Sequence, residues 1–157
     1  MDTLQVAAST LEALKFEYAR QMLAALLPAS LTVLLHGVGM DVVRRFYKHS
    51  GRPLLNGTHV AGRSAVLLGI VMIMLLTHFG EIVLWAIFYF LTDMMPSFKH
   101  AMFFSVNSYT TMGSSNLSLP DGWHGFSGFE AMTAMLMFGW STAMLASIIQ
   151  KFHSIDD

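Results

Sequence analysis

The sequence predicts an all-α membrane protein with three transmembrane helices, one short re-entrant helix and an irregular loop. Of its 157 residues, 54% are hydrophobic and only 12% are charged, whereas a soluble domain carries about 25% charged residues. Three stretches are apolar and long enough to cross about 30 Å of hydrocarbon at about 1.5 Å per residue. The bilayer is therefore the expected solvent of this chain.

Residues 1–21 form a mixed, amphipathic segment, which we expect to be a helix on or near the membrane surface. Leu4, Leu11 and Leu14 recur in it at roughly helical spacing. No Lys or Arg precedes Lys15, so the segment lacks the basic start of a secretory signal. The apolar segments that follow are then expected to belong to the mature protein.

Residues 22–63 are expected to hold an additional transmembrane helix, over 22–43, and a basic loop, over 44–63. We expect Pro28 to kink this helix or to divide it from the segment before it. The loop carries five of the nine Lys and Arg residues of the chain. The positive-inside rule therefore places the loop in the cytoplasm.

Residues 64–150 are expected to form a pore domain, with an outer helix over 64–91 and an inner helix over 126–150. Between them, residues 96–109 are too short to span the membrane, and apolar runs of about 10–14 residues are more often re-entrant or buried. The tail, residues 151–157, then lies on the cytoplasmic side. The N-terminus and the loop after the short helix face outside.

The loop segment 110–116, Thr-Thr-Met-Gly-Ser-Ser-Asn, has the chemistry of an ion filter. Irregular backbone at membrane depth is tolerated only where protein buries it or where it lines a wet cavity. The C-terminal end of a re-entrant helix carries partial negative charge, which favours a cation. Thr110 and Thr111 add hydroxyl oxygens there, and Gly113 adds backbone freedom. Carbonyl and hydroxyl oxygens can then replace the water around a cation.

One such strand supplies oxygens on only one side of an ion. Four copies around an axis can surround it, so we expect a homotetramer with C4 symmetry. The inner helix then lines the inner part of the pore. Ser141 and Thr142 are the expected polar lining, and Gly139 is a position where the helix can bend.

Four motifs between Thr77 and Gln150 carry a family resemblance: residues 78–81 (His-Phe-Gly-Glu), 85–89 (Trp-Ala-Ile-Phe-Tyr), 108–113 (Ser-Tyr-Thr-Thr-Met-Gly) and 138–142 (Phe-Gly-Trp-Ser-Thr). They resemble the pore domain of the potassium-channel family, and small bacterial pore-loop channels with an extra N-terminal helix in particular. The resemblance implies passive K+ conduction across the bacterial inner membrane. It also implies K+ sites at the backbone carbonyls of Thr111, Met112 and Gly113 and at the Thr111 hydroxyl.

The outer half of the filter departs from the family pattern, Thr-Val-Gly-Tyr-Gly-Asp. Met112 replaces the valine, and Ser114, Ser115 and Asn116 replace the tyrosine, the second glycine and the aspartate. Serine is too small to brace the filter as the family tyrosine does. A left-handed conformation at Ser115 costs roughly 1 kcal/mol or more, and Asn116 removes a ring of negative charge at the mouth. We expect fewer than the usual four dehydrated ion sites.

Other functions remain open at this stage. We favour a K+-permeable channel, with a non-selective monovalent (Na+/K+) or divalent-permeable cation channel as the alternative. A non-conducting membrane accessory protein needs three unbroken spans, against which segment 110–116 argues. A membrane redox or haem enzyme using His36 and His78 has no further support, and His36 is expected to pack between helices.

Three residues are expected to support the filter: Glu81, Trp85 and Tyr109. Intramembrane carboxylates need a partner, and for Glu81 we expect backbone of the pore helix or filter, with pH tuning of filter inactivation as the alternative. His78 lies one turn before Glu81 and can pair with it, although a metal site needs more ligands than these two. Glu130 is expected to cap or brace the outer end of the inner helix.

The expected partners are further copies of the chain and membrane lipid. The net charge of −1 gives no support for nucleic-acid binding, and the absence of cysteine excludes disulfides and thiolate metal sites. No enzyme activity and no cofactor are expected, only permeant K+ or Na+ ions. Seven residues follow the inner helix, so no soluble ligand-binding domain is expected, and no arginine series marks a voltage sensor.

Overall fold

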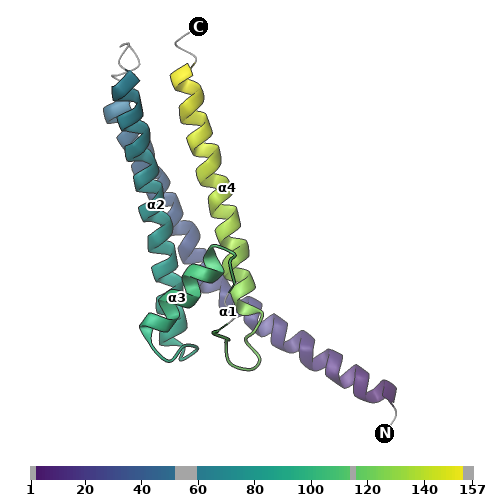
Figure 1. The fold of residues 1–157 in the computed structure, drawn as a ribbon. Helices are drawn as coiled ribbons and strands as arrows, with labels where there is room; N and C mark the ends of the chain where they lie inside the picture. The colour runs from purple at the N-terminus through teal and green to yellow at the C-terminus, as the bar shows by residue number, and fades with distance from the viewer. Residues whose placement is uncertain (1–2, 52–59, 114–115, 154–157) are drawn as a thin grey trace. The chain divides into compact units, whose positions relative to one another are not determined.

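The computed structural model describes residues 3–51, 60–113 and 116–153 (Figure 1). In chain order they form α1 (Thr3–Phe46), the π-helix η1 (Tyr47–Gly51), α2 (Val60–Leu91), α3 (Phe98–Tyr109) and α4 (Phe126–His153). No β-strand occurs in these described ranges. The prediction of an all-α chain is confirmed.

Three of the helices are long and apolar enough to cross a membrane, over Gln5–Gly51, Ala61–Leu91 and Phe126–Phe152. At most 39% of the most apolar stretch of each is buried within the chain. The remaining apolar side chains need lipid or other protein to cover them. The chain is therefore a membrane protein, as its composition predicts.

The first helix differs from the prediction, because α1 joins the segment 1–21 and the helix 22–43 into one element. Pro28 lies inside α1 and is fully buried, and the helix does not end there. Proline removes one helical hydrogen bond, a loss that membrane helices tolerate because neighbouring groups satisfy the freed carbonyl. The continuous helix argues against a division at Pro28, and the expected kink there stays a prediction.

The basic loop predicted over 44–63 is also shorter than expected. Helical structure continues through η1 to Gly51, and α2 begins at Val60, while residues 52–59 lie outside the described residues. Arg44 and Arg45 occupy the last turn of α1, where positive charge compensates the carbonyl end of a helix.

The described residues divide into two compact units. The first unit comprises Met1–Leu31 and Ile82–Ala134, and the second comprises Thr32–Glu81 and Met135–Asp157. The first therefore holds the beginning of α1, the end of α2, all of α3 and the start of α4. The second holds the remaining parts of α1, α2 and α4.

Aromatic rings form the core of the first unit around Phe126. Its ring lies 5.8 Å from that of Trp85, 5.5 Å from that of Phe88 and 5.9 Å from that of Tyr89, measured between centroids. Tyr89 also meets Phe104 of α3 edge to face at 5.1 Å. Stacked and edge-to-face pairs add specific geometry to apolar burial, so these contacts fix α3 against α2 and α4.

The end of the amphipathic segment contacts the loop before α4, also within the first unit. Gln21 donates a 2.8 Å hydrogen bond to the Gly122 carbonyl. The Arg20 guanidinium donates to the same carbonyl at 3.3 Å and lies 4.7 Å from the centre of a Trp123 ring. This part of α1 therefore packs on protein, whatever the environment of its exposed beginning.

Close helix packing characterises the second unit. Its core consists of Met40, Val43, Tyr47, Val66, Ile70, Met74, Ile148 and Phe152. A Cβ at Gly39 would overlap the Thr77 side chain, and one at Gly69 would lie 2.7 Å from the Phe46 ring. Glycine thus lets α1 and α2 approach closely, as small residues do at membrane helix interfaces.

Candidate functional site

The short helix α3 has local signals at both ends. Ser97 caps its start, where the Ser97 hydroxyl accepts a hydrogen bond from the His100 amide at 3.3 Å. At the other end, the Thr110 amide and the Thr110 hydroxyl both donate to the Val106 carbonyl, at 3.0 and 2.7 Å. The Thr110 hydroxyl is therefore engaged in a hydrogen bond at the end of the helix.

We call the segment after α3, Thr110 to Gly113, the strand, although it pairs with no sheet among the described residues. It has an unusual backbone. Thr111 has a φ of 60° and Gly113 a φ of 73°, both left-handed, whereas Met112 between them does not have a positive φ. The Gly113 amide donates to the Asn107 carbonyl at 3.1 Å, which folds the strand back on α3. A left-handed threonine is rare and costs about 1–2 kcal/mol, and such strain gathers at functional sites.

Thr110 to Gly113 are exposed in the single chain, and Met112 has an exposed fraction of 77%. Beside the strand lies an open pocket of about 380 Å³ between α3, the strand and the start of α4. Asn116 is also exposed, whereas Ser114 and Ser115 lie outside the described residues. A single chain therefore does not enclose this segment.

Trp85 and Tyr109, the two aromatic residues expected to support the filter, are both fully buried in the core of the first unit. Trp85 packs against Tyr89 at 6.2 Å and against Phe126. Tyr109 is the last residue of α3, directly before the strand. Their role in supporting the filter stays a prediction, and their burial is compatible with it.

Glu130 joins three helices in the same unit. Its carboxylate accepts a 2.5 Å hydrogen bond from the Ser105 hydroxyl on α3 and a 2.7 Å bond from the Tyr89 hydroxyl on α2. The Ser105 hydroxyl also lies 2.9 Å from the Ile82 carbonyl. Glu130 is thus a brace for α3, which extends its predicted role at the end of the inner helix. No role is predicted for Ser105 from the sequence, although a serine inside an apolar helix is a signal for such a bond.

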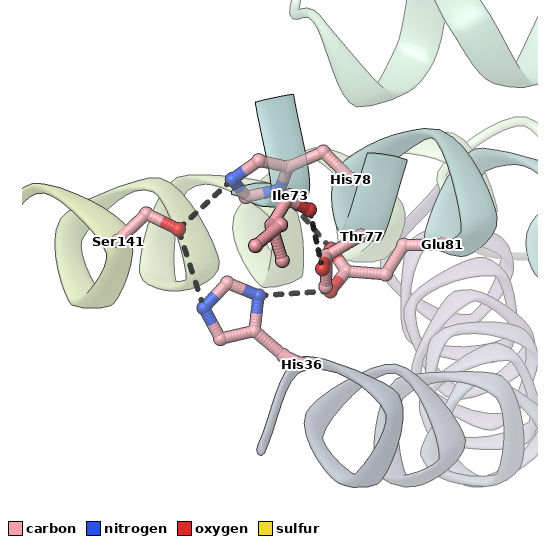
Figure 2. Close-up of polar contacts among 6 residues, drawn as sticks. All are labelled: His36, Ile73, Thr77, His78, Glu81 and Ser141. Atoms are coloured by element: carbon pink, nitrogen blue, oxygen red, sulfur yellow. Dashed lines mark hydrogen bonds and ion pairs between the residues drawn. The ribbon is translucent and has the colours of Figure 1, made fainter. Parts of the chain in front are cut away.

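A second polar cluster lies within the second unit (Figure 2). His36 Nδ1 is 2.8 Å from Glu81 Oε1, and His78 Nδ1 is 3.3 Å from Glu81 Oε2. On the other side of the two rings, the Ser141 hydroxyl lies 3.4 Å from His36 Nε2 and 3.1 Å from His78 Nε2. Glu81 and Ser141 thus each bridge both imidazoles.

This cluster changes two expectations. His36 is a polar partner of Glu81 and not only a packing residue between helices. Ser141 is buried against the two histidines in the single chain, a contact that its predicted pore-lining role did not include, and that role stays a prediction. At about 100° per residue, positions two apart lie on nearly opposite sides of a helix, so Ser141 and Gly139 face different surroundings.

The remaining expectations for these helices stay predictions. Gly139 has open space at its Cβ position, and Thr142 is exposed with its hydroxyl bonded to the Phe138 carbonyl. Glu81 contacts His36 and His78. Its predicted contact with the pore helix or filter stays a prediction, because α3 and the residues after it belong to the other unit.

Comparison with known proteins gave one match. Residues 72–151 are similar to the family model described as "Ion channel", a pore domain of the two-helix potassium-channel type. The match includes part of α2, all of α3, the strand after it and most of α4, and it leaves α1 outside. No curated protein and no solved structure matches the chain.

Proposed function

The chain belongs to this ion-channel family, and from that premise we propose that it conducts K+ passively through a homotetrameric pore with a non-standard filter. Family membership makes it a pore-forming channel in a membrane. What we propose beyond family membership is the identity of the conducted ion, the chemistry of the filter and the number of copies in the pore.

The alternating backbone of Thr111, Met112 and Gly113 carries the proposal. In a β-strand successive carbonyls point to opposite sides. Where left- and right-handed residues alternate, successive carbonyls turn to the same side. Such a row of oxygens replaces the hydration shell of a cation in a filter.

The surroundings of this strand also support a cation site. It follows the C-terminal end of α3 directly, and that end carries a partial negative charge equivalent to about half an electron. Glu130 and the aromatic core hold α3 in place. A fixed helix end can direct its field at a site without reorganising when an ion arrives.

The exposure of residues 110–113 supports an assembly of several copies. One strand leaves an ion open to water on its other sides, whereas four strands around an axis surround it. In this assembly the exposed backbone faces the axis. Gly139, Ser141 and Thr142 stay the candidates for the inner pore, and of these Gly139 and Thr142 are exposed in the single chain.

Selectivity for K+ is the finer part of the proposal. Thr111, Met112 and Gly113 supply the inner ion sites, and we propose that fewer than four dehydrated sites form, because Ser114 and Ser115 replace residues that complete the outer ones. The same replacements favour a second candidate, a non-selective cation channel with a wider outer vestibule.

The orientation in the membrane follows from the charges. We propose that the N-terminus lies outside and that the C-terminus and the basic residues around η1 face the cytoplasm of a bacterial cell, by the positive-inside rule. Labelling of single cysteines placed in the two termini, in intact cells, tests this orientation because the chain has no cysteine of its own.

The test of function is ion flux. The purified chain is reconstituted in liposomes, and K+, Na+ and Ca2+ fluxes are measured separately, with mass determination in detergent for the number of copies. K+ flux well above Na+ flux supports the proposal, and equal fluxes support the non-selective channel. The double variant Ser114→Tyr, Ser115→Gly should raise the K+ to Na+ ratio. Absence of all fluxes from folded, tetrameric protein would overturn the conduction proposal.

A further inference from the structure

Two imidazoles and one carboxylate converge in the second unit, and one donor atom from each of His36, His78 and Glu81 lies within 4.8 Å of the other two. The side chains of His36 and Glu81 are 0% exposed and that of His78 is 12% exposed. Titratable groups are costly inside a membrane and mark functional sites there. We propose that these three residues bind a divalent transition-metal ion, with Zn2+ as the ion of best fit.

The Nδ1 atoms and the carboxylate have nearly the spacing of zinc ligands. In a tetrahedral site with bonds of about 2.0–2.1 Å, neighbouring ligand atoms are about 3.4 Å apart. The His36 Nδ1 to Glu81 distance is 2.8 Å and the His78 Nδ1 to Glu81 distance is 3.3 Å. The two nitrogens face different oxygens of the carboxylate, Oε1 and Oε2, and one ligand atom of each residue lies within 4.8 Å of the others. We propose that side-chain shifts bring the two nitrogens and one oxygen around the ion, with water as a fourth ligand.

Ser141 supplies the outer partner that such ligands use. A histidine bound to a metal through one ring nitrogen donates the hydrogen of the other to a fixed acceptor, which holds the ring in place. Both Nε2 atoms face the Ser141 hydroxyl oxygen, at 3.4 and 3.1 Å. A hydroxyl oxygen has two lone pairs, so Ser141 accepts from both rings.

The donor set selects the class of ion. Imidazole nitrogen suits Zn2+ and its transition-metal neighbours, whereas Mg2+ and Ca2+ prefer sites made of oxygen alone. His36 lies outside the residues matched by the family model, and His78, Glu81 and Ser141 lie inside them. The bound ion therefore ties the additional helix α1 to α2 of the pore domain, and the proposal does not depend on which ion the pore conducts.

The test counts metal in the full-length protein in detergent. After removal of metal by a chelator and equilibration with Zn2+, the unmodified chain should retain about one Zn2+ per chain by mass spectrometry. Co2+ at the same site should give the visible absorption of tetrahedral coordination. Zn2+ should also raise the thermal unfolding temperature, because it binds only the folded state.

Conservative variants identify the ligands. His36→Gln and Glu81→Gln should weaken Zn2+ binding by more than about 100-fold, and Ser141→Ala by roughly 10–100-fold, the range seen for outer partners. His124→Gln is the matched control, because His124 is an exposed histidine of the first unit. Size-exclusion profiles and helical circular dichroism establish that each variant is folded.

Two results would overturn the proposal. One is folded, unmodified protein that retains no Zn2+ and gives no tetrahedral Co2+ spectrum. The other is retention that is equal in His36→Gln, Glu81→Gln and the unmodified chain. Either result makes the cluster a hydrogen-bonded joint between helices and leaves the proposed conduction untouched.

Discussion

Tyr89 on α2 donates a 2.7 Å hydrogen bond to the carboxylate of Glu130 on α4, and both side chains are fully buried. The same carboxylate accepts the hydroxyl of Ser105 on α3. The short helix that leads into the proposed filter is therefore tied by polar bonds to α2 and α4.

Replacing Glu130 with alanine should destabilise the first unit. The change leaves the buried Tyr89 hydroxyl without its acceptor, at a cost of about 1–3 kcal/mol, whereas the Ser105 hydroxyl keeps the Ile82 carbonyl as an acceptor at 2.9 Å. Thermal unfolding in detergent should show a clear fall in midpoint, and K+ flux should fall with it. Tyr89→Phe removes one bond and should cost only about 1 kcal/mol. An unchanged midpoint for Glu130→Ala would show that the brace adds no stability.

The two adjacent threonines should differ in their effect on conduction. The Thr110 hydroxyl is bonded to the Val106 carbonyl, whereas that of Thr111 is the proposed ion ligand. Thr111→Val keeps the shape and removes the hydroxyl, so K+ flux in liposomes should fall roughly tenfold, the effect of about 1.4 kcal/mol on a barrier. Thr110→Val is the control and should change flux much less. Equal losses in the two variants contradict this assignment.

The variant Gly113→Ala tests whether conduction needs the left-handed backbone at this position, because an added methyl group would meet no neighbouring atoms. The φ of Gly113 is 73° and nothing lies within 4 Å of the position its Cβ would take. An alanine therefore meets no clash but pays about 1–2 kcal/mol for the left-handed conformation. K+ flux should fall while the helical content is unchanged. Gly128→Ala is the control and should leave K+ flux intact, because Gly128 lies in α4 and a Cβ there also meets no atom within 4 Å. An unchanged K+ flux in Gly113→Ala would refute the proposed role of the left-handed backbone.

The close contact of α1 and α2 predicts a coupled pair of substitutions. Gly39→Ala should destabilise the chain by about 1–3 kcal/mol, because its methyl group overlaps the Thr77 side chain. Thr77→Ala in the same chain should recover part of that loss, measured as a double-mutant cycle of unfolding midpoints. Gly139→Ala, where the space is open, is the control. Additive effects of Gly39→Ala and Thr77→Ala would exclude direct contact.

Most of the fold is predictable because its signals are local. An apolar run of a given length predicts a span, and α2 ends at residue 91 and α4 begins at residue 126, where the sequence expectation places those ends. The short helix is expected over 96–109, and α3 begins two residues later, at Phe98, because Ser97 caps its start. The continuity of α1 through Pro28 is not predictable in this way, because it depends on neighbours that satisfy the interrupted helix.

Which buried polar residues contact one another across helices is not predictable from their spacing in the sequence. His36 is 45 residues from Glu81, and Ser141 is 105 residues from His36. Their meeting depends on how each helix is rotated about its axis, and a nearly uniform apolar helix carries little information about that rotation. The pairing of His78 with Glu81 is the exception, because i and i+3 share a helix face.

The sequence by itself determined that this chain is a membrane protein of three long helices, and that a short helix with a threonine-glycine strand lies between two of them. Composition, run length and turn residues act locally, so they need no knowledge of the rest of the chain. Tertiary structure alone decided that Glu130 braces α3, that Ser141 turns to two histidines and that Thr111 and Gly113 share the left-handed conformation. These features depend on which surfaces the helices present to one another, because buried polar groups must find partners wherever packing places them.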